Sequence, residues 1–189
     1  MLTGGDTTKD RLMRAALKVV AREGFGGATT AAIAAETGVA EGTLYRHFPS
    51  KDDLLIGVYR RLKSEVAEAI IQGEEGGADP ASRLKALWLT TIRAYQSDID
   101  AFVFGQRFSE SALSAREGGM AHEQIFAGLG RLHDAGVKAG VFKNLPVNLL
   151  ANLFFGPVTY MIKSEIAGQH WTDEELDLAA DAVLDAWRA

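Results

Sequence analysis

The chain has 189 residues, 47% of them hydrophobic, so it can fill the core of one large domain or of a small domain followed by a larger one. It has no cysteine, which excludes disulfides and thiolate metal sites, and its net charge of -5 disfavours nonspecific binding to polyanions. Its first residues lack a signal-peptide pattern and its longest apolar stretch, residues 148–162, is too short for a membrane span, so we expect a cytoplasmic protein with no membrane partner.

The charge is divided unevenly along the chain. Residues 1–51 carry seven Lys or Arg against five acids, whereas the remainder carries 13 basic and 20 acidic residues. A modestly basic N-terminal part, residues 1–51 (the head), joined to an acidic remainder (the body), suits a protein that contacts DNA at one end only.

The first helix is predicted from Thr8 to Glu23, where apolar residues recur at helical spacing. Thr7 or Thr8 can cap its N-terminus, and Gly24 stands where a C-terminal glycine is expected. The spacing therefore indicates an amphipathic helix near the start of the chain.

A helix-turn-helix is predicted directly after it. Thr29 is a suitable N-cap for a short helix that ends at Gly38, a residue that suits a left-handed turn. Another helix, from about Ala40 to Phe48, places Leu44 and Phe48 one turn apart on its buried side. Two short helices around a glycine turn make this motif, whose second helix lies in the major groove of DNA.

A long fourth helix is predicted from Lys51 to about Gln72. Ser50 can cap it, and Asp52 and Asp53 in its first turn oppose the helix dipole. The polar sequence GEEGGADP, residues 73–80, is typical of a loop. The rest of the chain shows no β-type alternation and predicts five more helices: Ser82–Ser97, Asp100–Arg116, Met120–Ala139, Val147–Ile166 and Asp173–Trp187.

The predicted recognition helix carries side chains suited to DNA. Four side chains on or beside this helix can donate hydrogen bonds to phosphate: Thr43, Tyr45, His47 and Lys51. Gly42 leaves room for close approach of the backbone. Base reading falls to Glu41, which can accept from cytosine N4, to Arg46, which can pair with guanine, and to Thr43 at a thymine methyl.

The run ATTAAIAAETGVAEGTLYRHFPSKDDLL, Ala28 to Leu55, resembles the DNA-binding domain of the TetR family of bacterial transcriptional regulators. The positions that fall at the family's spacing without a gap are Thr29, Ile33-Ala34, Gly38-Val39, Gly42, Leu44-Tyr45, Phe48, Lys51 and Leu54. The resemblance implies that Thr43, Tyr45, His47 and Lys51 hold phosphates, together with Thr29 and Thr30. Ala40 departs from the pattern, because the family commonly has Ser or Thr there to cap the recognition helix.

We therefore expect an all-α fold of about nine helices. Residues 1–51 form the predicted helix-turn-helix domain, and the long fourth helix joins it to residues 52–189, a larger helical domain for ligand binding and dimerisation. The resemblance implies a homodimer that binds double-stranded, near-palindromic operator DNA. It further implies a repressor that leaves the operator when a small molecule binds the C-terminal domain.

Two groups of residues in the body are candidates for these roles. A largely apolar effector is expected among Trp88, Ile92, Tyr95, Phe102, Phe104, Arg107, Phe108, His122, Phe126 and Phe155. The dimer interface is expected on the last two helices, at Leu149, Leu153, Phe154, Leu176, Ala180, Val183, Leu184 and Trp187. Apolar residues also fill ordinary cores, so packing inside the subunit stays open as the alternative for both groups.

Other classes of protein find little support in the sequence. The four histidines are scattered and no HExxH or equivalent ligand spacing is present, so we expect no enzyme activity, no metal and no cofactor. The rival function is a helical protein-interaction module without DNA binding. The salt dependence of DNA affinity separates that function from a DNA-binding regulator.

Overall fold

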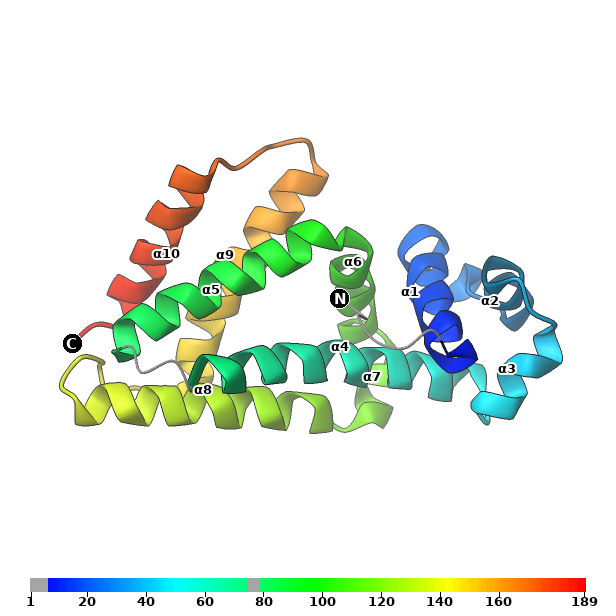
Figure 1. The fold of residues 1–189 in the computed structure, drawn as a ribbon, viewed down its shortest axis with the longest axis horizontal. Helices are drawn as coiled ribbons and strands as arrows, with labels where there is room; N and C mark the ends of the chain where they lie inside the picture. Colours follow the sequence, from blue (N-terminus) through cyan, green and yellow to red (C-terminus); the bar gives the residue numbers. More distant parts are fainter. Residues whose placement is uncertain (1–6, 75–78) are drawn as a thin grey trace. The chain divides into compact units, whose positions relative to one another are not determined.

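The computed structural model describes residues 7–74 and 79–189, which form ten helices, labelled in Figure 1. The helices are α1 Thr8–Gly27, α2 Thr30–Thr37, α3 Glu41–His47, α4 Lys51–Glu74, α5 Pro80–Ser97, α6 Ile99–Ser109, α7 Ala112–Glu117, α8 Met120–Lys138, α9 Val147–Ile166 and α10 Asp173–Trp187. The described residues form no strand beyond an isolated bridge between Phe142 and Arg188, so the all-α prediction is confirmed. Part of the predicted loop at 73–80, residues 75–78, lies outside the described residues.

The predicted boundaries of the first helices are confirmed by their caps. The Thr7 hydroxyl accepts from Asp10 N at 3.2 Å, and Thr29 Oγ1 accepts from Ala32 N at 3.0 Å. Gly24 has a φ of 75° and interrupts α1 at the expected place, with one more helical turn after it. Gly38 adopts the left-handed conformation, with a φ of 73°, which is strained for residues that carry a Cβ.

The recognition helix α3 begins without a side-chain cap. Ala40 occupies the N-cap position in extended conformation and offers no hydrogen-bonding side chain to the first turn. By contrast, Ser50 Oγ accepts from Asp53 N at 3.1 Å at the start of α4. The first turn of α4 is thus stabilised by a polar cap, whereas the first turn of α3 is not.

One predicted helix is two in the structure. The expected helix at Asp100–Arg116 is divided into α6 and α7 between Ser109 and Ala112. The Ser111 backbone is extended, and both its amide and its hydroxyl donate to Phe108 O, at 3.0 and 2.7 Å. The serine hydroxyl thus shares the Phe108 carbonyl with the amide at this break, a contact that serine readily makes with nearby backbone. This division raises the helix number from the expected nine to ten among the described residues.

The contacts divide the chain into two compact units. Unit 1 comprises Met1–Glu65 and Asp98–Ala121, and unit 2 comprises Val66–Ser97 and His122–Ala189. These units are defined by packing. The predicted boundary between residues 51 and 52 instead separates a DNA-binding domain from a domain for ligand binding and dimerisation, and it remains a prediction. No helix among the described residues is both long and apolar enough to cross a bilayer.

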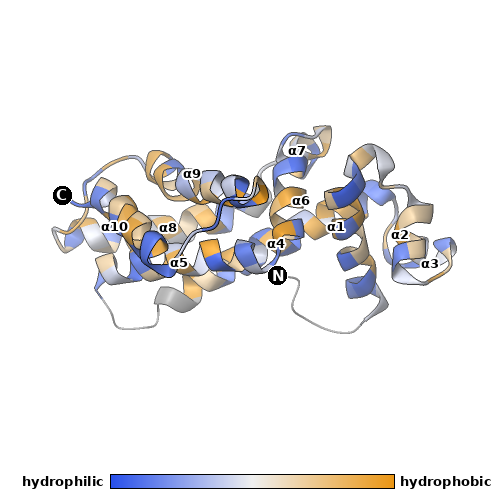
Figure 2. Cartoon of the chain, turned by 90° about the horizontal axis from the view of Figure 1, so that it is seen from above, coloured by the Kyte–Doolittle hydropathy of each residue, from blue (hydrophilic) through white to orange (hydrophobic). Residues whose placement is uncertain are grey.

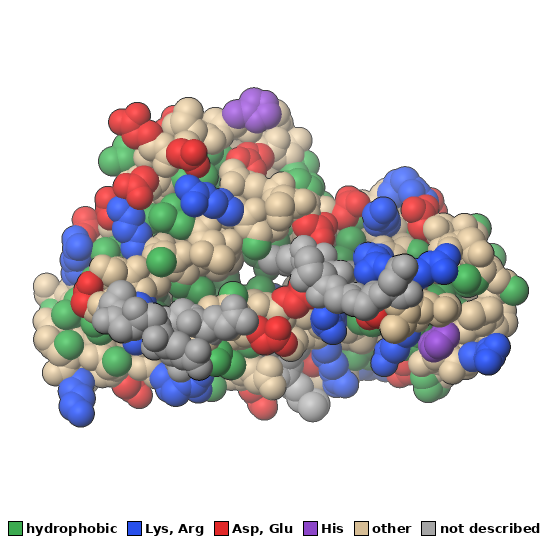
Figure 3. Space-filling view, in the orientation of Figure 1, with side chains coloured by type: hydrophobic (Ala, Val, Ile, Leu, Met, Phe, Trp, Pro, Cys, Tyr) green, Lys and Arg blue, Asp and Glu red, His purple; other side chains and the backbone are tan. Residues whose placement is uncertain are grey.

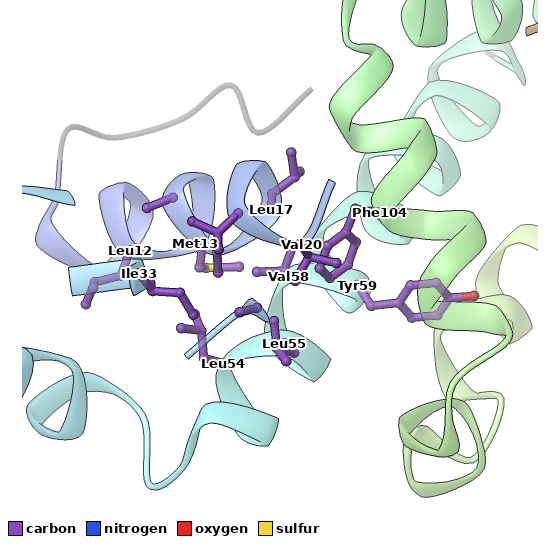
Figure 4. Packing of buried hydrophobic residues seen from close by; sticks show 14 of the residues in the cluster. Leu12, Met13, Leu17, Val20, Ile33, Leu54, Leu55, Val58, Tyr59 and Phe104 are labelled. Carbon is purple, nitrogen blue, oxygen red and sulfur yellow. The ribbon is translucent and has the colours of Figure 1, made fainter. Parts of the chain in front are cut away.

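Unit 1 has one core, shared by the helix-turn-helix and by α4 and α6. Leu12 of α1, Ile33 of α2, Leu44 of α3 and Leu55 of α4 are all fully buried in it, and Figure 4 shows side chains of α1, α4 and α6 turned toward one another. The Tyr59 ring stacks on that of Phe108, with 4.1 Å between centroids. The helix-turn-helix is therefore held by α4 and α6 as well as by its own helices.

In unit 2, α5, α9 and α10 pack on one another. The buried Trp88 indole N–H donates to Phe154 O at 3.0 Å, which joins α5 to α9. The ammonium of Lys85 lies 3.0 Å from an Asp177 oxygen and 2.8 Å from an Asp181 oxygen, which joins α5 to α10. Colouring by hydropathy shows hydrophobic and hydrophilic sides on these helices, as expected for amphipathic helices (Figure 2).

Restoring the missing cap should stabilise the head. We expect Ala40→Ser to raise the free energy of unfolding by about 0.5–1 kcal/mol, because a serine oxygen can accept from the first free N–H groups of α3. Urea denaturation followed by circular dichroism measures this change. Ala35→Ser, at an exposed position inside α2, adds the same side chain without a cap and should give no gain. Equal effects of the two substitutions would contradict the explanation.

Candidate functional site

The helix-turn-helix turn is held by backbone and side-chain hydrogen bonds. Val39 N donates to Ala34 O at 3.1 Å, across the left-handed Gly38. The Arg11 guanidinium donates to Thr37 O at 2.8 Å, so α1 also holds the carbonyl beside the turn. Leu44 and Phe48 are buried, as the sequence predicted. The turn is therefore fixed in orientation before any ligand binds.

The predicted DNA-binding residues lie mainly on the surface of this motif. Tyr45 is 55% exposed, which is high for an aromatic side chain and leaves its hydroxyl free to reach a ligand. The remaining side chains are exposed or half-buried: Thr29, Thr30, Glu41, Gly42, Thr43, Arg46, His47 and Lys51. A Cβ built on Gly42 would meet no protein atom within 4 Å, so the space beside it is open. That these nine residues bind DNA remains a prediction.

The cations on this surface are available to an anion. Among residues 7–74 and 79–189, no carboxylate forms an ion pair with Arg46 or Lys51. On the same unit, Arg22 is instead paired with Glu23 at 3.0 Å and with Glu36 at 3.3 Å. Figure 3 shows Lys and Arg side chains gathered over the end of the chain formed by α1 to α3. Available cations and hydroxyl groups together form a surface suited to phosphate.

One contact joins two of the predicted DNA-binding residues. The hydroxyl of Thr30, at the start of α2, donates to Glu41 Oε1, at the start of α3. The two residues are 11 positions apart, so no helical or strand periodicity predicts the pair. Only the return of the chain at Gly38 brings them together.

The predicted effector residues are divided between the two units. Phe102, Phe104, Arg107 and Phe108 belong to unit 1, and the others, Trp88, Ile92, Tyr95, His122, Phe126 and Phe155, belong to unit 2. Phe104 and Phe108 are fully buried against Phe25, with centroid distances of 6.1 and 6.2 Å. Phe126 is 38% exposed, and Tyr95 and Phe155 are half-buried. Any effector role for these residues remains a prediction.

Arg107 binds another helix of its own unit. Its Nη1 donates to Val20 O at 2.5 Å, near the point where Gly24 interrupts α1. Val20 O lies in the turn before this interruption, where the helix dipole is negative, so the guanidinium supplies a charged hydrogen bond there. Arg107 therefore links α6 to α1, the first helix of the head.

Lys63 is not among the site residues predicted from the sequence. Its ammonium lies 5.3 Å from the centroid of the Tyr59 ring, a cation–π contact, and no carboxylate of the described residues pairs with it. Burial lowers the pKa of Lys63 to about 8. Its position four residues after Tyr59 on one helix was the available sequence signal, but that spacing is common on solvated helices.

The predicted dimer residues fall into two classes. Leu149 and Leu153 of α9 are 46% and 38% exposed, respectively. The other six are buried within unit 2: Phe154, Leu176, Ala180, Val183, Leu184 and Trp187. Tyr160 and Leu178 are exposed apolar side chains on the same two helices that the sequence reasoning did not select. The interface remains a prediction, in which the exposed side chains would make contact and the buried ones would support them.

Comparisons with known proteins point to one family of bacterial regulators for both the N-terminal and the C-terminal parts of the chain. A family model described as bacterial regulatory proteins, tetR family, matches residues 12–58, and one described as a tetracyclin repressor-like C-terminal domain matches residues 81–189. The Fatty acid metabolism regulator protein of Bacillus subtilis is 25% identical over 186 residues, covering 93% of this chain and 91% of the relative.

Solved structures of similar fold cover almost all of the chain. A TetR family transcription regulator from Marinobacter aquaeolei is 25% identical with a TM-score of 0.87, and the match covers 97% of this chain and 96% of the other. The regulator FadR from Bacillus subtilis, solved in complex with stearoyl-CoA, is 20% identical with a TM-score of 0.78, and the match covers 93% and 95%.

Replacing Lys63 should change how stability depends on pH. The pKa of about 8 in the folded protein lies below the ordinary lysine value of 10.5, so the unfolded chain binds more protons between these values. The folded protein should therefore gain stability as pH rises from about 8 to 10.5. Lys63→Met should be more stable than the parent at pH 7 by about 1–3 kcal/mol and should lose this pH-dependent gain.

The measurement is urea denaturation at pH 7 and pH 10, with the difference between parent and variant taken at each pH. Lys18→Met, at an exposed position of α1, is the matched control and should leave the difference near zero at both values. A constant difference for Lys63→Met across this range would show that burial does not perturb its charge.

Proposed function

Since the chain belongs to the TetR family of bacterial regulatory proteins, which are DNA-binding transcriptional regulators, we propose that it is a cytoplasmic homodimeric repressor of a near-palindromic operator. The observation that carries the proposal is the set of unpaired cations and exposed hydroxyl groups on α3 and at the start of α4, around a rigid turn. Family membership does not support the alternative function of a helical interaction module without DNA binding. The proposed role includes no catalytic step.

Phosphate contacts have a clear division of labour in this proposal. Thr43, Tyr45 and His47 of α3 donate to the backbone of one half-site, and Lys51 does so at the first turn of α4, where free N–H groups add to the positive field. Thr29 also remains able to donate, because its cap uses the hydroxyl oxygen as an acceptor. Two such surfaces related by a twofold axis bind the two half-sites of the operator.

The effector in this proposal is a long-chain acyl thioester of coenzyme A. Two observations support it: a relative that matches nearly the whole chain is a fatty acid metabolism regulator, and FadR was solved with stearoyl-CoA. Aromatic side chains suit the acyl chain, whose transfer from water favours binding. Lys63 is the cation that we assign to an anionic group of the ligand, because no carboxylate of the described residues neutralises it.

Release requires that the effector prefer the state that does not bind the operator. A 100-fold preference corresponds to about 2.7 kcal/mol. In unit 1 the contacts that can carry such a bias to the head begin at the α6–α7 corner. Arg107 binds Val20 O of α1, while Glu117 binds Arg60 at 3.2 Å and Arg116 binds Asp52, the residue after Lys51.

The DNA-binding part predicts a steep salt dependence. Operator affinity, measured by fluorescence anisotropy at several salt concentrations, should fall linearly on a log–log plot. Lys51→Ala should weaken binding similarly on all sequences and reduce the slope by about 1.8, because each copy of the dimer loses one phosphate contact. Lys138→Ala, an exposed change on α8, should leave the slope unaltered. An absence of salt-dependent DNA binding would refute the function.

The effector part predicts release of DNA by stearoyl-CoA. Titrated into the complex, it should lower operator affinity by 100-fold or so at saturation, whereas coenzyme A alone should have little effect because it lacks the acyl chain. In Lys63→Met the effector concentration for half-release should rise, with operator affinity unchanged in its absence. Unchanged affinity at saturating stearoyl-CoA would contradict this choice of effector while leaving DNA binding intact.

A further inference from the structure

Glu41 is an anion on a surface otherwise suited to phosphate. It is exposed on the first turn of α3, and no cationic side chain of the described residues pairs with it. A carboxylate that approaches DNA loses hydration and is repelled by phosphates, so it weakens binding unless a donor on the DNA satisfies it. Its presence there thus needs an explanation beyond general attraction to DNA.

The Glu41 side chain is held in place. The Thr30 hydroxyl donates to its Oε1, and Thr30 lies directly after the N-cap residue Thr29, whose oxygen accepts from Ala32 N at 3.0 Å. The backbone beneath both residues is fixed by the Gly38 turn and by burial of Leu44. Because an ionised carboxylate can accept several hydrogen bonds, its second oxygen remains free to accept from a ligand.

The chemistry of that ligand follows from the carboxylate. Phosphate oxygens offer no hydrogen and cannot bind it. In the major groove, donors are the exocyclic amines, N4 of cytosine and N6 of adenine, and an acidic side chain suits the cytosine amine. Building on the proposed function, we infer that Glu41 selects cytosine at one position of each operator half-site and that Thr30 is the residue that positions its carboxylate.

This role also changes the assignment of Thr30. A hydroxyl that donates its single proton to Glu41 cannot donate it to phosphate at the same time. The pair contributes discrimination more than affinity. At guanine or thymine the carboxylate faces acceptors and is left without a partner, and at adenine the acceptor N7 lies beside the N6 amine. Specificity at this position therefore comes mainly from rejecting other bases.

The test is selection of bound sequences from a randomised DNA library, followed by affinity measurements on single base-pair changes. The parent protein should prefer cytosine at one half-site position by about 5- to 150-fold. Glu41→Ala should reduce that preference to within about 2-fold and raise affinity for nonspecific DNA, while preferences elsewhere and the salt slope persist. Glu41→Gln should shift the preference to adenine, since glutamine pairs with N6 and N7 of adenine.

Thr30 is tested by the same selection. Thr30→Val keeps the shape but removes the donor, so discrimination at the cytosine position should fall while other positions are unchanged. Thr30→Ser restores a hydroxyl and should recover most of the discrimination. Glu36→Gln removes one negative charge from α2, where Glu36 pairs with Arg22, and should leave the preference at the cytosine position unchanged.

Circular dichroism of each variant ensures that only folded proteins are compared. The inference is overturned if Glu41→Ala retains the base preferences of the parent at every position, if it weakens binding equally on all sequences, or if the parent selects adenine there. Salt-dependent operator binding by the parent would persist in each of these cases, so the proposed function would stand. If the parent protein does not bind DNA at all, both the proposed function and the inference about Glu41 are refuted.

Discussion

Burial of Ile33 and Leu44 holds the two DNA-facing helices in place. Helices of eight and seven residues are marginal in water, because nucleation is costly and few hydrogen bonds follow it. In this protein α2 and α3 persist because their apolar residues enter a core made with α1, α4 and α6. The exposed side chains of the head, including Tyr45 and Glu41, are thus presented by helices that could not hold that geometry alone.

The same core connects the head to the rest of unit 1. Phe25 packs on Phe104 and Phe108, Tyr59 stacks on Phe108, and Arg107 binds the carbonyl of Val20. Packed aromatic rings and charged hydrogen bonds are stiff connections, because close-packed side chains cannot shift without loss of contact. A displacement of α6 would therefore be felt by α1, and through it by the turn that Arg11 holds.

The surface of the head combines attraction with rejection. Cations and hydroxyl groups favour any DNA, which supplies affinity but little discrimination. A carboxylate among them disfavours most sequences and tolerates those that present a donor. Because the chain has a net charge of -5 and as a whole repels polyanions, we expect any DNA binding to depend on this local arrangement of side chains.

Features that depend on neighbours along the chain could be predicted from the sequence. Caps at Thr29 and Ser50, the left-handed Gly38 and the uncapped Ala40 were all predicted, since each involves bonds over at most a few residues. The family pattern added which surface residues to assign to DNA.

Tertiary structure alone decided the partners of residues distant in sequence. It joined Thr30 to Glu41 and Arg107 to Val20, it buried Phe154 and Trp187 within the subunit, and it left Lys63 beside an aromatic ring without a carboxylate. The break between α6 and α7 at Ser111 belongs with these, because serine there is compatible with a continuing helix as well as with a break. Hydrophobic periodicity along the sequence shows which side of a helix is apolar. Which helix packs against that side depends on the path of the whole chain, which periodicity does not give.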